Sequence, residues 1–420
     1  MCIRDRVIIE LPNDYFQGEI TNNWAFPVMF GAILIPPVII ALLWFIFGRD
    51  PRIVKTVEFY PPNGLTPAEA GYIVDGVVDK RDIVSMIIYF ADKGYLTIEE
   101  KEKDEFTLHK KTELPATAKI FELTLFDGLF QNRDQVELKE LGEDFYAHYK
   151  AAISQLEGYY KKESDKRVYT LGSTLARVFS FLFMLIPLIG GYIFGAIGSM
   201  KDELVLIGLA ITNIIFLGAV MLIIAYDRKD AMKASSRRIL VVSGLIAIGI
   251  GVVSEFYSMW KVAGILPSFL MTISTLVSVV FTIFMKKRTG YSAESMGKLL
   301  GFKEFIHVAE VDRIKLLVEQ NPSYFYHVLP YAYVFGLSDK WAKKFEQIRV
   351  EPPTWYSGNL NGSMFNTWLF ISMMNSYTRS FSNNIVMPTS ESNGGGIGGG
   401  FSSGGGFTGG GFGGGGGGAW

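Results

Sequence analysis

The sequence is poor in the side chains that build disulfides and transition-metal sites. Its 420 residues include one cysteine, Cys2, and four histidines. An intrachain disulfide and a cysteine-based zinc site are therefore excluded. The histidines (His109, His148, His307 and His327) are scattered, and no pair has a metal-ligand spacing such as H-E-x-x-H. We expect neither a metal nor another cofactor.

Net charge and catalytic motifs are lacking as well. The formal net charge of −1 does not favour a nucleic-acid-binding protein or an acidic binding surface. The phosphate-binding motif G-x-x-x-x-G-K-[ST] and the nucleophile motifs G-x-S-x-G and S-x-x-K do not occur in a context that supports catalysis. We therefore expect that the protein is not an enzyme.

Long apolar runs are what the sequence does contain. Residues 25–47 form one run, and residues 176–285 form four more with short breaks between them. Each run has about 20 residues, the length of a helix that crosses a hydrocarbon core of roughly 30 Å. The expected boundaries in the second block are about 176–197, 204–225, 239–257 and 263–285. The chain is predicted to be a multi-pass α-helical membrane protein.

The loops that follow these runs are alternately rich and poor in lysine and arginine. The loops after the second and fourth runs carry only Lys201 and Lys261. Because basic residues in short loops stay cytoplasmic, we expect the N-terminus outside, the C-terminus inside and a bacterial plasma membrane location. The basic residues of the other three loops are Arg49, Arg52, Lys55, Arg228, Lys229, Lys233, Arg237, Arg238, Lys286, Lys287 and Arg288.

Residues 48–175 are predicted to form a cytoplasmic α+β domain like a winged helix. Thr66 and Pro67 are typical of a helix start, and a second helix begins near Asp79 and ends at Gly94. Two strands and two further helices are expected at residues 95–100, 105–110, 115–130 and 142–162. Residues 61–170 carry 15 Lys and Arg against 21 Asp and Glu, the wrong sign for binding phosphates. Cytoplasmic protein partners are therefore expected, and nucleic acid is not.

The other segments are shorter or simpler in composition. Residues 286–350 are predicted to be a small cytoplasmic helical domain, and residues 351–420 a low-complexity, Gly-rich tail that is disordered. Residues 1–24 are interpreted as the remnant of an extracytoplasmic domain. We hypothesise that the first six residues are foreign to the protein and that the natural chain extends further towards the N-terminus.

Several motifs occur in the order found in one family. They are Glu58–Gly71 (EFYPPNGLTPAEAG), the block from Asp82-Ile83 to Gly94-Tyr95-Leu96, Gly301–Phe305 (GFKEF), Leu329–Gly336 (LPYAYVFG) and Trp341–Phe345 (WAKKF). With these motifs and the glycine tail, residues 48–420 resemble the family of YciQ-like predicted bacterial membrane proteins, whose shared domain has no known function. The resemblance implies a larger extracytoplasmic domain before the first span, and it implies no chemistry.

Three polar residues in or near the spans are candidate intramembrane contacts. Asn213 lies near the middle of the third run, where a polar group marks either a transport path or a hydrogen bond between helices. Glu255 is expected near the outer end of the fourth run, within reach of water and of Lys261 as a partner. No charge is expected at mid-depth.

We interpret the protein as a membrane-anchored interaction or sensory scaffold that links an extracytoplasmic domain to cytoplasmic partners. The alternative is a component of a membrane transporter with a path past Asn213. A membrane enzyme ranks third because no catalytic constellation is visible. The lipid bilayer is one partner in every case, and the sequence does not define an oligomeric state.

Overall fold

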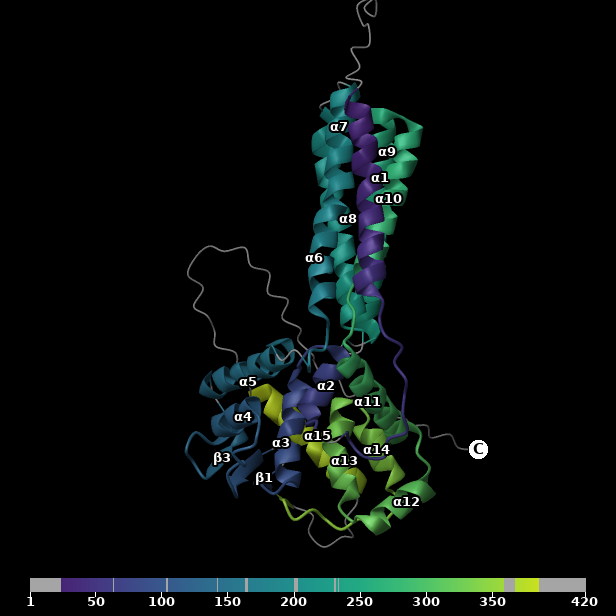
Figure 1. The fold of residues 1–420 in the computed structure, drawn as a ribbon. Helices are drawn as coiled ribbons and strands as arrows, with labels where there is room; N and C mark the ends of the chain where they lie inside the picture. The colour runs from purple at the N-terminus through teal and green to yellow at the C-terminus, as the bar shows by residue number, and fades with distance from the viewer. Residues whose placement is uncertain are drawn as a thin grey trace, which may run out of the picture. The chain divides into compact units, whose positions relative to one another are not determined.

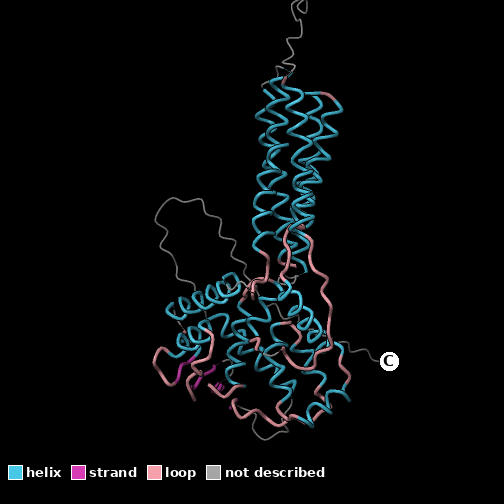
Figure 2. The backbone as a smooth tube through the Cα atoms, viewed as in Figure 1, coloured by secondary structure: helices cyan, strands magenta, loops and turns pink. Residues whose placement is uncertain are grey.

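The computed structural model describes residues 24–62, 64–102, 105–141, 143–162, 165–199, 203–229, 232, 234–358 and 367–384. These residues are mostly helical, and the strands form one small sheet (Figure 2). The chain divides into a first unit of Met1–Lys55, Ile73–Val77 and Tyr160–Gly297 and a second unit of Thr56–Tyr72, Val78–Tyr159 and Lys298–Trp420. The predicted N-terminal remnant, except Trp24, and most of the predicted glycine-rich tail lie outside the described residues.

The first unit contains a bundle of long apolar helices (Figure 1). Its helices are α1 (Ala25–Leu43), α6 (Leu171–Leu185), α7 (Gly191–Ser199), α8 (Glu203–Asp227), α9 (Ala234–Ala263) and α10 (Ile265–Ile283). Two π-helical turns, Trp44–Gly48 and Ile186–Gly190, extend α1 and join α6 to α7. Within the described residues, five stretches are long and apolar enough to cross a membrane: Ala25–Gly48, Leu171–Gly198, Ala210–Asp227, Ala234–Ala263 and Ile265–Ile283.

Helix boundaries differ from the apolar boundaries for local reasons. The π-helical turn between α6 and α7 contains Pro187, which has no N–H to donate and so interrupts the α-helical ladder. The helix α6 begins at Leu171, before the apolar run that starts at residue 176. It begins there because the Thr170 hydroxyl accepts a hydrogen bond from the backbone N–H of Ser173 at 3.3 Å. Hydrogen bonding, rather than hydropathy, thus decides where α6 begins.

Glycines allow α8 and α9 to approach closely. A Cβ atom at Gly218 of α8 would lie 2.9 Å from the carbonyl oxygen of Gly244 on α9, and one at Gly251 would lie 2.4 Å from Ile215 Cγ1. Both distances are too short for real Cβ contacts. Larger residues at these positions would therefore push the two helices apart.

The remaining elements lie outside the spans. The helices are α2 (Pro67–Asp75), α3 (Lys80–Asp92), α4 (Ile120–Phe130), a 3-10 turn (Leu138–Glu140), α5 (Glu143–Lys162), α11 (Gly290–Val308), α12 (Val311–Gln320), α13 (Tyr324–Val334), α14 (Ser338–Lys344) and α15 (Thr367–Asn384). The strands are β1 (Leu96–Glu102), β2 (Glu105–Lys110), β3 (Gln135–Glu137) and β4 (Tyr356–Ser357).

Local signals explain where α2 and α3 begin, which confirms both predicted starts. The backbone N–H of Thr66 donates to Glu69 Oε2 at 2.9 Å, and the Thr66 hydroxyl accepts from the N–H of Glu69. Asp79 and Asp82 exchange the same pair of hydrogen bonds at the start of α3. Each pair is a capping box, which satisfies backbone donors that the helix leaves free.

The strand order in the sheet is β3-β2-β1-β4. Three of these strands precede the four later spans in the sequence, and β4 follows them. The two predicted strands are confirmed, and they form a hairpin in which β1 and β2 are antiparallel with Ile98 opposite Leu108. On the other side of β1, β4 pairs in parallel, with Ile98 opposite Tyr356. Residues before and after the four later spans therefore share one sheet.

The helix α15 corrects the prediction that the chain loses regular structure after residue 350. Its buried residues Phe370, Met374, Tyr377 and Phe381 have helical spacing, a periodicity that the sequence interpretation missed. The Phe370 ring packs against Tyr326 of α13 at 5.7 Å, Tyr377 against Phe106 of β2 at 5.3 Å, and Phe381 against Phe145 of α5 at 5.6 Å. The second unit thus contains parts of the regions predicted as separate domains at 48–175 and 286–350.

Replacing Phe370 by Ala should therefore destabilise the second unit by about 3–5 kcal/mol, because a fully buried ring leaves a cavity. The measurement is urea unfolding of the full chain in detergent, followed by the fluorescence of the buried Trp341 and Trp355. Ser372→Ala, at an exposed position of the same helix, is the matched control. Equal midpoints for the two variants would show that α15 is not part of this core.

Candidate functional site

The candidate site is a carboxyl group buried between helices of the bundle. Glu255 lies on α9 about two turns before its end at Ala263, and it is 0% exposed. Thr275 of α10 donates a hydrogen bond from Oγ1 to Glu255 Oε1 at 2.8 Å. The other carboxyl oxygen, Oε2, is buried without a hydrogen-bond partner in the described part of the chain. One of the two oxygens is thus unsatisfied.

The buried face of α10 is rich in hydroxyl groups, which belong to Ser268, Ser274, Thr275, Ser278 and Thr282. Ser268 donates to the backbone carbonyl of Gly264, the residue before α10, and Thr282 donates to that of Ser278, one turn earlier in α10. Ser274 donates across the bundle to the carbonyl oxygen of Ile33 on α1 at 2.7 Å. The hydroxyl of Ser278 and that of Thr272 have no partner among the described residues. We call this row of hydroxyls, with Glu255, the polar seam.

The helix α7 approaches the same residue from another direction. The hydroxyl oxygen of Tyr192 lies 2.5 Å from Ser258 Oγ and donates to the backbone carbonyl oxygen of Glu255 at 3.3 Å. Ser258 in turn donates to the carbonyl oxygen of Ser254 at 2.7 Å. The helices α7, α9 and α10 therefore meet at Glu255.

The structure does not bring the three sequence candidates together. Asn213 lies at an exposed position of α8. Lys261 is exposed near the end of α9, with its Nζ atom 5.6 Å from the ring centre of Tyr257. Glu255 is fully buried and bonded to Thr275 instead of lying within reach of water beside Lys261. The packing of α9 against α10 determines that the Glu255 side chain points into the bundle. A hydropathy profile gives no information about this packing.

A second polar cluster, missed by the sequence analysis, surrounds Arg177 of α6. Its guanidinium holds both carboxyl oxygens of Asp227, at 2.7 and 3.1 Å. It also donates to the carbonyl oxygens of Thr282 and Ile283 in the last turn of α10, where carbonyl groups run out of partners within the helix. Lys286 Nζ lies 3.6 Å from Asp227 Oδ2. Burial lowers the pKa of Lys286, against the attraction of Asp227.

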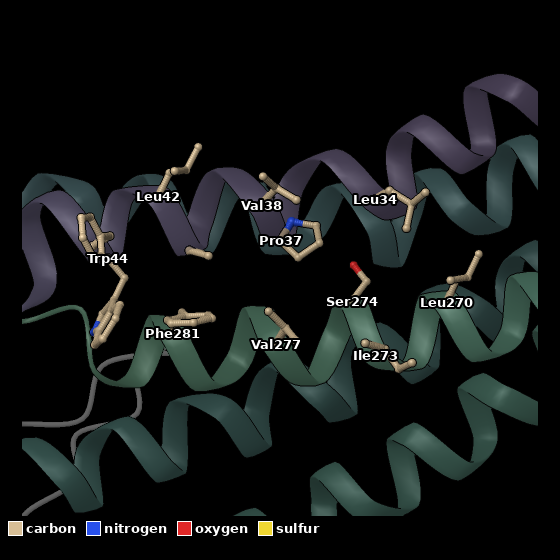
Figure 3. Close-up of a pocket in the computed structure, with 12 residues that line it drawn as sticks. Leu34, Pro37, Val38, Leu42, Trp44, Leu270, Ile273, Ser274, Val277 and Phe281 are labelled. Atoms are coloured by element: carbon tan, nitrogen blue, oxygen red, sulfur yellow. The ribbon is translucent and has the colours of Figure 1, made fainter.

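An apolar groove of about 550 Å³ lies between α1 and α10 (Figure 3). The indole N–H of Trp44, which lines it, donates to the carbonyl oxygen of Phe284 at 3.1 Å. Ser274 supplies the only side-chain hydroxyl of the lining, and its hydrogen is already donated to Ile33. The groove therefore suits hydrocarbon and offers no chemistry. The other lining residues are Leu34, Pro37, Val38, Ala41, Leu42, Phe45, Leu270, Ile273, Val277 and Phe281.

Buried acidic groups of the second unit stabilise helix ends. Glu69 Oε2 lies 2.5 Å from Lys119 Nζ as well as accepting from Thr66. Glu122 accepts from the backbone N–H of Lys119 at 2.7 Å, and burial raises the pKa of Glu122. His327 Nδ1 lies 2.7 Å from Asp92 Oδ2. Within the described residues, no group of three or more His, Cys, Asp and Glu is placed to hold a metal ion.

Fold and site define a multi-pass helical membrane protein that also carries a substantial domain outside its spans. The family described as "Predicted membrane protein (DUF2207) C-terminal domain" matches residues 56–237 and 225–345, more than half of the chain. The protein belongs to this family of predicted membrane proteins, which confirms the family resemblance seen in its motifs. No curated protein and no solved structure matches the chain.

Replacing Arg177 by Met should lower the free energy of unfolding by on the order of 3 kcal/mol, because it removes one partner of a buried ion pair. The measurement is unfolding of the full chain in mixed micelles with increasing denaturing detergent. Adding Asp227→Asn should restore part of the loss, because the remaining carboxylate is neutralised.

Arg237→Met, at an exposed position of α9, is the matched control and should change the free energy of unfolding by less than about 0.5 kcal/mol. Equal losses for the Arg177 and Arg237 variants would contradict a stabilising role of the Arg177 cluster.

Proposed function

We propose that this protein is a membrane-anchored interaction or sensory scaffold whose second unit binds cytoplasmic proteins. The observation that carries the proposal is the make-up of that unit. The second unit combines segments that precede the four later candidate spans in the sequence with segments that follow them. These segments share one sheet and one aromatic core. A domain joined to the membrane block through several chain connections is suited to hold a partner at the membrane surface.

The orientation of the scaffold rests on two arguments. Segments that fold into one domain lie on the same side of a membrane, and the even number of candidate spans between them agrees with this. The excess of Lys and Arg in alternate loops then assigns that side to the cytoplasm. Under this proposal the protein lies in a bacterial plasma membrane, with its C-terminal part inside.

Protein partners fit the second unit better than nucleic acid or a substrate. The order α2, α3, β1, β2 supports a winged-helix-like arrangement, but acidic residues outnumber basic ones in residues 61–170, which disfavours phosphate binding. Its buried acids, Glu69 and Glu122, already take part in helix capping and pairing. We therefore propose a binding role without catalysis.

Transport past Asn213 is the less supported alternative. A side chain that lines a path through the bundle of one chain would lie among its helices. Asn213 lies at an exposed position of α8 instead. A path at this residue would need a further protein against that face.

Labelling of single cysteines in intact cells tests the orientation. In a Cys2→Ser background, cysteine replaces Thr117, Ser236, Lys261 or Ser372, all at exposed positions, and an impermeant maleimide is added. We expect only the Lys261 position to react, because the other three lie in the cytoplasm. Different labelling of Thr117 and Ser372 would contradict a shared domain, and labelling of both would reverse the orientation.

Site-specific photo-crosslinking in living cells tests the scaffold role. A photoreactive residue replaces Ile120 of α4 or Leu316 of α12, which are 70% and 50% exposed in the second unit, or Ile250 of α9 as a span control. We expect discrete protein adducts from the first two positions and none from the third. Absence of adducts at Ile120, Leu316 and their exposed neighbours would argue against a scaffold.

A further inference from the structure

We propose that Glu255 is a proton-binding site within the bundle. Its carboxyl group is neutral while α9 packs against α10, and it releases its proton to water only when that contact opens. The proposal does not depend on the scaffold role. It assigns a ligand, the proton, to a residue buried in the bundle.

The first argument is the cost of a buried charge. Glu255 is fully buried, and the hydroxyl of Thr275 is the one described donor to its carboxyl group. A carboxylate in such surroundings needs a cation or several donors, and otherwise takes up a proton. The Arg177 cluster shows the contrast, because there the Asp227 carboxylate meets a guanidinium and an ammonium group.

The groups that face Glu255 are neutral. The helix α10 contributes hydroxyls, and α7 contributes the Tyr192 hydroxyl, the titratable group that lies beside it. Of the described titratable side chains on α8, Asp227 is held by Arg177 and Tyr226 packs against Phe284. On α9 itself, Lys261 is exposed near the helix end. Among the side chains that the structure describes, the neighbouring helices therefore offer no charge to balance an ionised Glu255.

The second argument is geometric. The hydrogen bond from Thr275 occupies Oε1, and Oε2 is buried and unpartnered. This arrangement suits a protonated carboxyl better than a carboxylate, because one oxygen accepts and the other carries the hydrogen, and an unpartnered neutral O–H costs less than an unpartnered charged oxygen. The unpartnered hydroxyls of Thr272 and Ser278 lie three residues before and after Thr275, so polar groups flank Thr275 along α10 in both directions.

A proton fits these groups better than a metal cation. Hard cations such as Ca²⁺ take six or more oxygen ligands, with carboxylates supplying the balancing charge. Here a single carboxyl group meets neutral hydroxyls, and no cluster of three acidic or histidine ligands occurs in the described residues. A proton needs only the one free oxygen. Raising the pH is then expected to weaken the contact between α9 and α10, because the ionised carboxylate cannot remain buried.

Infrared spectroscopy of the full chain in phosphatidylcholine vesicles tests the proposal. The difference between wild type and Glu255→Gln at neutral pH should show the carbonyl band of one protonated carboxyl group. Thr275→Val should move that band to higher frequency, because Oε1 loses its hydrogen bond. In heavy water the band should shift to lower frequency, which reports exchange of the proton. Glu319→Gln, at an exposed position of α12, is the control and should leave the band unchanged.

Each of three results would overturn the assignment. Absence of the difference band at neutral pH would show that Glu255 is ionised. A band that never shifts in heavy water would show a proton that does not exchange. Loss of the band when sodium replaces choline at constant pH would identify a cation site. Gel filtration of each variant establishes that the protein is folded before its spectrum is compared.

Discussion

Four candidate membrane spans separate the two chain segments that build the second unit, and the rest of the architecture depends on their coming together. The parallel pairing of β4 with β1 and the packing of α13 on α3 are contacts across this separation. They require that both segments emerge on one side of the membrane. They also delay folding, because the apolar surface of the first segment stays uncovered until the spans and the second segment have been made. Such a domain forms only after the membrane block is in place.

The aromatic side chains of α15 show how this late closure is stabilised. One helix places Phe370, Tyr377 and Phe381 against α13, β2 and α5 in turn. Aromatic pairs of this kind contribute about 0.5–1.5 kcal/mol each beyond the burial of their area. The contacts are spread along the helix, so the last segment of the domain is held at three places and not by a single anchor.

Local patterns in the sequence predict much of this fold, and contacts between helices account for what they miss. The capping boxes at Thr66 and Asp79 predict the starts of α2 and α3 because every interacting group lies within three residues. The orientation of Glu255 depends on which side of α9 meets α10. The role of Arg177 depends on Asp227 and on the end of α10, both distant in the sequence. A profile of apolar residues predicts neither the orientation of Glu255 nor the partners of Arg177. For Glu255 the reason is that α9 is apolar on nearly every side, so the profile does not show which side meets α10.

The same reasoning explains why a few polar residues matter so much within the bundle. Lipid surrounds apolar helix faces as well as another helix does, so burial of apolar area alone does not choose how the helices rotate or which of them pair. Close approach at Gly218 and Gly251 sets the spacing of α8 and α9. The hydrogen bonds of Arg177, Ser274 and Thr275 then select a rotation for α6 and α10, because an unsatisfied polar group in hydrocarbon is costly. Glu255 fits this logic only in part. One of its oxygens is satisfied and the other is not, and the hydroxyls of Thr272 and Ser278 on α10 are unpartnered as well. The polar bonding at the α9–α10 contact is therefore incomplete, and adding or removing the proton of Glu255 changes the charge buried there.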